Sequence, residues 1–211
     1  MKTDTLIDLL SRQAGPAPRA LVASRLSPAA LAGLFVSALA AITWFGPIPA
    51  TMFATAVPWT KMVYAGALAL AAGWLTARLS RPAAPLQRPQ RAVFAVVGVM
   101  AMMGGISLVS EPAGGRVQAL LGHSWSSCPW SVLALSLPGL AAALWAVRGL
   151  APTRPRAAGF GAGLMAGSVG AFGYALSCPE ASSAFVAVWY SLGIALTGIV
   201  GAVLGPRVLR W

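Results

Sequence analysis

The chain has 211 residues, of which 58% are hydrophobic and only 9% charged, too little charge for the surface of a water-soluble domain. Fifteen Lys and Arg against four Asp and Glu give a formal net charge of +11, but these cations lie between apolar segments and form no nucleic-acid-binding motif. We therefore predict an integral membrane protein that has the lipid bilayer as a partner and binds no nucleic acid directly.

Residues 1–27 are predicted to form a cytoplasmic N-terminal leader that begins MKTDTLIDLL. Thr3 favours a short amphipathic helix because its hydroxyl can cap the first turn. The apolar side chains expected to bind a partner are Leu6, Ile7, Leu9 and Leu10. A helix this short is marginal alone and would gain order on a partner or on the membrane surface. The alternative is a frayed leader without a function.

Residues 28–211 are predicted to form an all-α domain, a polytopic membrane protein built as a bundle of six transmembrane helices. Each apolar stretch is close to the length that crosses the hydrocarbon core, and Gly, Pro and Arg separate the stretches. The predicted spans are Pro28–Phe45, Thr60–Leu79, Ala92–Val109, Pro129–Val147, Ala157–Ser177 and Ser182–Gly205.

The basic residues predict the orientation of the bundle. If the six spans alternate, 13 of the 15 cations fall on one side, and only Lys61 and Arg116 fall on the other. The positive-inside rule then places both termini in the cytoplasm. Lys61 lies near the outer end of its span, where we expect its side chain to extend to the lipid headgroups.

Small residues recur at every fourth position in the last two spans. The two series are Gly159, Gly163, Gly167 and Ala171, and Gly193, Thr197, Gly201 and Gly205. Small residues allow transmembrane helices to approach closely, so both series are predicted to face neighbouring helices.

The two cysteines share one local pattern, in HSWSSCP at 123–129 and SCPEASS at 177–183. In each, Ser-Cys-Pro precedes an apolar run on the non-cytoplasmic side, which places Cys128 and Cys178 near helix N-termini, where the helix dipole favours the thiolate. His123, Glu180 and Glu111 are expected on the same side and could tune the thiols or share a metal.

Several roles of the cysteines stay open. They could form a structural disulfide, toggle between dithiol and disulfide, bind a heavy metal transiently, or have no joint role. No C-x-x-C motif or second histidine is present for a closed zinc site, so we expect no resident cofactor. One histidine and spans without acidic residues argue against an enzyme. The alternatives are a membrane thiol-disulfide oxidoreductase and a small metal transporter.

The chain resembles the NrsF family, the negative regulators of sigma F, in its start MKTDTLIDLL, in HSWSSCP and in SCPEASSAFVAVWYSLGI at 177–194. The resemblance implies a six-span anti-sigma factor of the bacterial inner membrane, involved in transcription regulation and the stress response. It implies that the protein sequesters an extracytoplasmic-function sigma factor on the cytoplasmic face and releases it under heavy-metal or oxidative stress. Cys128 and Cys178 would then be periplasmic sensing thiols for this redox or metal signal.

Overall fold

The computed structural model describes residues 3, 7–8, 21–81, 84–150 and 152–210, and within these the chain is helical without β-strands. The predicted all-α class is confirmed. The longer helices are α2 (Leu21–Phe45), α3 (Ala56–Leu79), α4 (Gln87–Ser110), α6 (Cys128–Arg148), α7 (Pro155–Tyr174) and α9 (Ser191–Val208). The short elements are η1 (Ala50–Ala54), α5 (Arg116–Leu121), α8 (Ser183–Phe185) and the π-helical η2 (Val186–Tyr190).

Five helical segments of the described chain are long and apolar enough to cross a membrane. They are Val22–Phe45, Ala56–Leu79, Gln87–Ser110, Cys128–Arg148 and Ser183–Val208. The sixth predicted span, Ala157–Ser177, corresponds to α7, which is not among them. α7 has 20 residues, but its six glycines lower its mean hydropathy, and 15 of its residues are buried inside the bundle. Five described helices thus meet the length and hydropathy expected of membrane-crossing segments, and the six predicted spans are not confirmed; α7 runs between the same two ends inside the bundle.

The first span begins earlier than predicted. Helix α2 starts at Leu21, and Pro28 lies inside it. The additional turns form because Val22 and Leu26, four residues apart, point to the same side and are both buried. The predicted boundary between the leader and the membrane domain therefore falls within a continuous helix.

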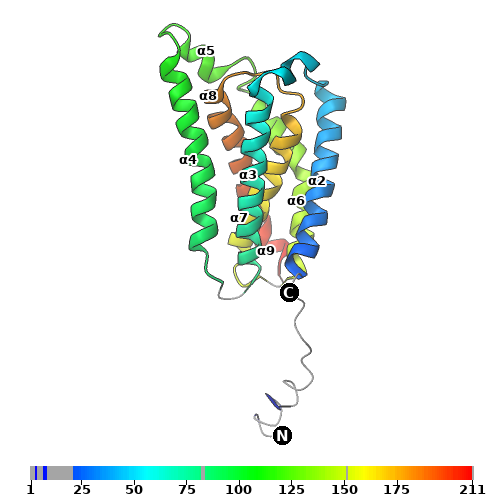
Figure 1. The fold of residues 1–211 in the computed structure, drawn as a ribbon. Coiled ribbons are helices and arrows are strands. Elements are labelled where there is room, and N and C mark those ends of the chain that lie inside the picture. The colour runs from blue at the N-terminus through cyan, green and yellow to red at the C-terminus, as the bar shows by residue number, and fades with distance from the viewer. Residues whose placement is uncertain (1–2, 4–6, 9–20, 82–83, 151, 211) are drawn as a thin grey trace.

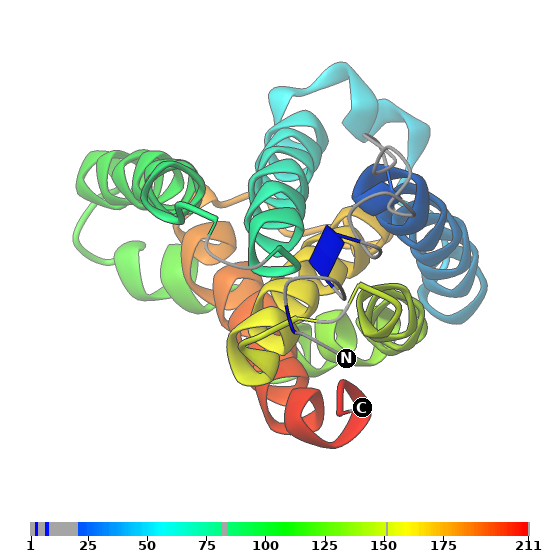
Figure 2. The same cartoon turned by 90° about the horizontal axis from the view of Figure 1, so that it is seen from below.

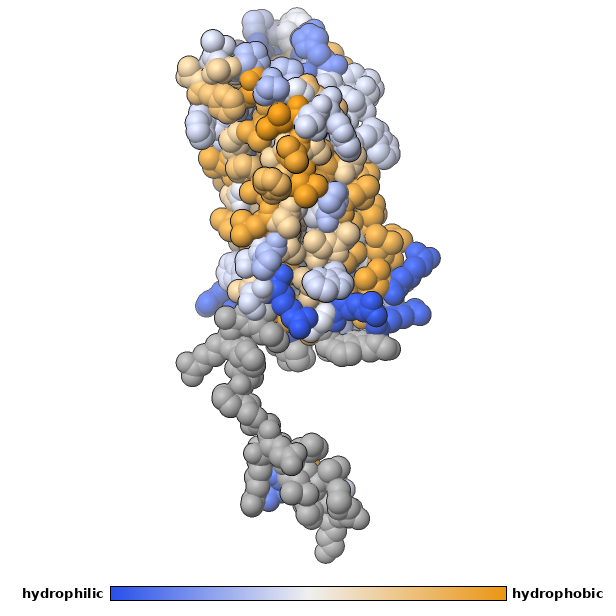
Figure 3. Space-filling view, turned by 90° about the vertical axis from the view of Figure 1, so that its right-hand side faces the viewer, coloured by the Kyte–Doolittle hydropathy of each residue, from blue (hydrophilic) through white to orange (hydrophobic). Residues whose placement is uncertain are grey.

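The long helices run up and down, so that α2 begins and α9 finishes at the same end of the bundle (Figure 1). We name this the basic end; the opposite end, which holds Cys128 and Cys178, is the thiol end. Figure 3 shows strongly hydrophilic residues gathered around the basic end, below a broad band of hydrophobic residues. The described arginines of the basic end are Arg25, Arg78, Arg81, Arg88, Arg91, Arg148, Arg154, Arg156, Arg207 and Arg210.

Helix α7 lies in the middle of the bundle, as Figure 2 shows, and its closest neighbour is α9. Both small-residue series face neighbouring helices, as predicted, and most of their members face each other, whereas Gly193 faces Val132 of α6. A Cβ atom added at Gly163 would lie 2.8 Å from the Cα of Gly198, and one at Gly159 would meet the carbonyl oxygen of Gly201. The glycines are thus required for this backbone-to-backbone approach.

Helix α4 stands apart from the other long helices (Figures 1 and 2). It approaches the bundle closely at Gly104, where an added Cβ would lie 2.8 Å from the Cβ of Ala187. Gly104 and Met100 are buried, whereas Phe94 is 74% exposed. The bundle is therefore tight around α7 and loose around α4.

Among residues 1–20 of the leader, the structure describes only Thr3, Ile7 and Asp8, all helical. Ile7 is 60% exposed, which agrees with an apolar side chain available to a partner. The predicted contacts Leu6, Leu9 and Leu10 lie outside the described residues, so their role stays a prediction.

Candidate functional site: the thiol end of the bundle

Cys128 is the first residue of helix α6, and Pro129 follows it in the first turn. Proline is favoured there because the first helical amides have no partner within the helix. The amide of Cys128 donates to the carbonyl of Ser124 at 2.8 Å. The predicted position of Cys128 at a helix N-terminus is confirmed.

Cys178 has a different setting from the one predicted. Its amide donates to the carbonyl of Tyr174 at 3.0 Å, so the residue closes the turn after helix α7. The next helix begins only at Ser183, where the hydroxyl of Ser182 accepts hydrogen bonds from the amides of Ala184 and Phe185. The prediction of a helix N-terminus at Cys178 was wrong, because three residues separate Pro179 from the helix that was expected to begin there.

Both cysteines are fully buried, with an exposed fraction of 0% each, and both are free thiols. They lie close enough to interact electrostatically with each other and with Lys61. The fold therefore brings together two residues that are fifty positions apart in the sequence. Their complete burial shields both sulfur atoms from solutes, so the high reactivity expected of them requires an opening of the thiol end.

The side chain of Lys61 also points in a different direction from the one predicted. It is only 1% exposed, and its Nζ donates to the main-chain carbonyl of Cys178 at 2.7 Å. Cys178, Glu180 and Cys128 all lie within its electrostatic reach. Lys61 thus points into the bundle instead of toward lipid headgroups, and it connects α3 to the segment that follows α7.

Glu180 connects the two cysteine segments. Its Oε1 accepts from the amide of His123 at 2.7 Å, the amide of Ser124 at 3.0 Å and the hydroxyl of Ser124 at 3.0 Å. The side chain is only 8% exposed, so these three hydrogen bonds replace most of its water. Glu180 therefore holds the HSWSSCP segment against the segment that contains Cys178.

Gly122 permits this close approach. Its φ of +58° lies in the left-handed region that disfavours other residues. A Cβ atom at this position would also lie 2.7 Å from Cδ2 of Phe185 and 2.8 Å from Cδ of Glu180. The loop before α6 can therefore reach the Glu180 carboxylate only with glycine at this position.

The other two predicted site residues, His123 and Glu111, do not lie together. His123 lies beside Glu180, with 4.0 Å between its Nδ1 and Oε1, but its side chain is 83% exposed. Glu111 is exposed at the C-terminus of α4, where its main-chain carbonyl accepts from Nε of Arg116 at 3.2 Å. Within the described residues no group of three or more His, Cys, Asp or Glu side chains could hold a metal ion. The part of the chain that the structure describes thus contains no metal site with three or more such ligands.

Aromatic residues surround the thiols. Tyr190 is fully buried and lies 5.8 Å, ring to ring, from Tyr174, and both interact electrostatically with the cysteines. Trp189 precedes Tyr190 in the π-helical stretch, and its Nε1 donates to the carbonyl of Leu120 at 2.9 Å. Its ring also packs on Trp125 at 5.5 Å. The π-helix thus turns Trp189 toward the loop before α6 and Tyr190 toward the core, and such distortions are frequent at functional sites.

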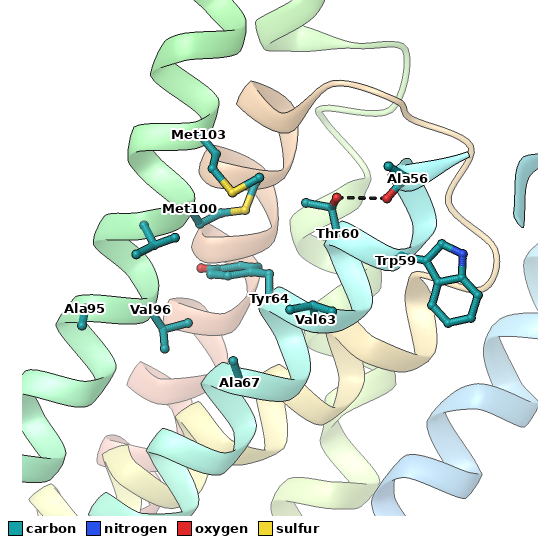
Figure 4. A pocket seen from close by; sticks show the side chains of 11 residues that line it. Ala56, Trp59, Thr60, Val63, Tyr64, Ala67, Ala95, Val96, Met100 and Met103 are labelled. Atoms are coloured by element: carbon teal, nitrogen blue, oxygen red, sulfur yellow. Dashed lines mark hydrogen bonds between the residues drawn. The ribbon is translucent and has the colours of Figure 1, made fainter. Parts of the chain in front are cut away.

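An apolar cavity of about 490 Å³ lies beside this region, between α3 and α4. Figure 4 shows Tyr64 and Met100 extending into the space between the two helices, with Met103 one turn further along α4. The hydroxyl of Tyr64 forms a hydrogen bond of 2.6 Å with the hydroxyl of Ser191. Tyr64 therefore joins α3 to α9 next to the loosely packed helix.

The sequence offered few signals for the residues it missed. Lys61 could have been noticed because it is one of only two cations predicted on the non-cytoplasmic side, where Glu111 and Glu180 are also predicted. Trp189 stood out inside the last predicted span, away from the interface where tryptophan is usual. Nothing in the sequence indicated that Tyr190 lies next to the thiols or that Glu180 binds the loop before α6.

Comparison with known proteins agrees with these observations. A family model described as negative regulator of sigma F matches residues 10–211. The anti-sigma-F factor NrsF of Caulobacter vibrioides (strain NA1000 / CB15N) is 40% identical, and the alignment covers 100% of both chains. The probable anti-sigma-F factor NrsF of Azospira oryzae (strain ATCC BAA-33 / DSM 13638 / PS) is 36% identical with the same coverage. No solved structure matches the chain. By this match over nearly its whole length, the chain belongs to the NrsF family, the negative regulators of sigma F.

Proposed function

We propose that this chain is an anti-sigma factor of the bacterial inner membrane, with its basic end and both termini in the cytoplasm. The five long apolar helices support the membrane location. The arginines gathered at one end support the orientation, because cytoplasmic segments carry an excess of Lys and Arg. In this orientation the thiol end faces the periplasm.

The partner that we propose is an extracytoplasmic-function sigma factor, bound at the cytoplasmic face. Both relatives carry the name anti-sigma-F factor, which supports a sigma factor as the partner class. The leader, with the exposed side chain of Ile7, is the segment we assign to this contact. Its apolar face, Leu6, Ile7, Leu9 and Leu10, would bind a groove on the partner as an amphipathic helix.

The signal that we propose is a change in the bonding of the two thiols. The observation that carries this proposal is the convergence of Cys128 and Cys178 on one buried site, held by Glu180 and Lys61. A hydroperoxide would convert the two thiols into a disulfide, accept two electrons and two protons, and leave as alcohol and water. A thiophilic divalent metal ion would bind both sulfur atoms with release of two protons.

Both reactions require the thiol end to open, since the sulfur atoms have no exposed surface. The response to either reaction would pass through α7, because Cys178 follows this helix directly and α7 reaches the basic end. The glycine contacts between α7 and α9 would transmit a shift of one helix to the other as a rigid-body movement. The sigma factor would then meet an altered surface at the basic end.

This arrangement favours a regulator over an enzyme or a transporter. A thiol-disulfide oxidoreductase usually relays electrons between the cysteines of a C-x-x-C motif, whereas the two cysteines here are fifty positions apart. The described membrane-crossing helices also contain no Asp or Glu that could couple transport to protons or ions.

The test is affinity capture of the tagged full-length chain from membranes, before and after treatment with hydrogen peroxide or a mercury(II) salt. We expect a sigma factor to be retained before treatment and released after it. Cys128→Ser and Cys178→Ser should keep the sigma factor bound under both treatments, whereas Ser126→Ala, an exposed neighbour of Cys128, should release it like the unaltered chain.

Normal release from both cysteine variants would refute the sensing role and leave the anti-sigma role standing. Failure of the unaltered chain to retain any sigma factor would refute the proposed function as a whole.

A further inference from the structure

A second site lies at the basic end, on the side where α4 stands away from the bundle. An apolar cavity of about 510 Å³ runs between α3, α4, α7 and α9, from Arg154 toward Tyr64 and Ser191. Its described walls include Leu68, Leu75, Val93, Val97, Phe160 and Leu164. The close contact of α4 at Gly104 lies near the thiol end; toward the basic end Pro89 is buried, whereas Phe94 between them is 74% exposed.

A smaller, polar pocket of about 280 Å³ adjoins this cavity. Arg78, Arg81 and Arg154 line it together with Thr153. Leu79, Leu86 and Arg154 line both spaces, so the cationic pocket and the apolar cavity are adjacent. The described residues that line the two spaces include no Asp or Glu, so none of the three guanidinium groups has a carboxylate partner within the site.

We propose that this pair of cavities binds an anionic phospholipid. The phosphate of the headgroup is held by Arg78, Arg81 and Arg154, because the planar guanidinium group matches phosphate oxygens in a two-pronged geometry. One acyl chain enters the apolar cavity and fills the space between α4 and the bundle. Basic pockets between membrane helices on the cytoplasmic side are suited to anionic headgroups in this way.

The position of the site favours a lipid over a free phosphate ion or a protein segment. A free phosphate ion would use the arginines but would leave the 510 Å³ apolar cavity beside them unused. Three of the four helices that bound the cavity, α3, α4 and α9, are also long and apolar enough to cross the membrane, where acyl chains are the natural neighbours. The proposal rests on the membrane placement given above and is independent of the sigma factor.

The test is native mass spectrometry of the purified full-length chain titrated with phosphatidylglycerol or phosphatidylcholine of the same acyl chains. We expect the anionic lipid to bind about 10- to 100-fold more tightly, as three basic contacts predict. The triple variant Arg78→Gln, Arg81→Gln, Arg154→Gln should lose this preference. The matched variant Arg88→Gln, Arg91→Gln, Arg207→Gln removes the same charge outside the two cavities and should keep it.

Further measurements distinguish a lipid phosphate from a free phosphate ion. They also distinguish failure of this inference from failure of the proposed anti-sigma function. Val97→Trp, which fills the apolar cavity, should weaken binding of the lipid, and inorganic phosphate should compete only weakly. Equal binding of both lipids, equal losses in the two triple variants, or inorganic phosphate binding as tightly as the lipid would each overturn the site. A chain that retains its sigma factor but shows no lipid preference refutes this inference alone; the reverse result refutes the proposed function alone.

Discussion

The thiol end and the basic end of this bundle differ in how their charges are used. At the thiol end the carboxylate of Glu180 and the ammonium group of Lys61 are buried, and each is hydrogen-bonded to a loop distant in sequence. At the basic end most arginines are exposed and surround open cavities. Buried charges must be matched by fixed partners, whereas exposed ones remain available to ligands. The thiol end is therefore built to hold one arrangement, and the basic end is built to bind.

The strongest test of this contrast is to remove the carboxylate of Glu180. Glu180→Ala should lower the free energy of unfolding by about 3–5 kcal/mol, since it leaves buried donors of His123 and Ser124 without an acceptor. Thermal unfolding in detergent, followed by tryptophan fluorescence, measures the change. Arg207→Gln at the basic end is the control, and we expect it to shift stability by less than about 0.5 kcal/mol. Equal effects of the two substitutions would remove the distinction between the ends.

The second test concerns the helix pair that joins the two ends. Gly163→Ala should destabilise the protein by about 1–3 kcal/mol, because the new Cβ would press on the backbone of α9 at Gly198. Gly98→Ala in α4 is the matched control, since a Cβ there meets nothing within 4 Å, and alanine also favours the helix. The same unfolding measurement should show the control to be neutral or slightly stabilising. A neutral Gly163→Ala would mean that α7 and α9 are not in close contact.

The third test separates the electrostatic role of Lys61 from its packing. Lys61→Met keeps the length of the side chain but removes the ammonium group that faces Cys178 and Cys128. We expect stability to change little, because losing the hydrogen bond is offset by removing the cost of burying a charge. Alkylation of the two cysteines by a small maleimide should become about tenfold slower, equivalent to about 1.4 kcal/mol of lost attraction for the thiolate.

Mass spectrometry of the labelled peptides would follow each cysteine separately. Lys61→Arg, which keeps the charge, should retain most of the reactivity. If Lys61→Met and the unaltered chain are labelled at the same rate, Lys61 is only a structural connection.

The smallest structural effect is expected in the leader. Replacement of Leu6, Ile7, Leu9 and Leu10 by Ser should leave the unfolding temperature of the bundle unchanged, since Ile7 is exposed. The same variant should lose the sigma factor in the affinity capture. Asp8→Ser, within the same segment but outside the four apolar positions, is the comparison variant. Full retention of the sigma factor by the quadruple variant would move the contact to another part of the basic end.

The sequence predicted the helical class, the approximate positions of the long helices and two glycine series that face neighbouring helices, because these depend on composition and on spacing along one helix. It was less successful where the orientation of a side chain depends on a neighbour. Lys61 looked like a residue for the headgroup region, yet the rotation of α3 turns it toward Cys178. Cys178 looked like a helix start because proline follows it, yet α7 extends almost to it and the next helix begins later.

Local chemistry along the chain thus determined which segments become helices, how they alternate and where the arginines gather. It also placed both cysteines at one end, because topology follows from the number and order of the spans. Only the tertiary structure decided that the two thiols are buried close to Glu180 and Lys61. It also decided that a cavity lies beside α4. The physical reason is that burial and hydrogen bonding depend on contacts between helices, whose rotation and spacing are set by the packing of the whole bundle.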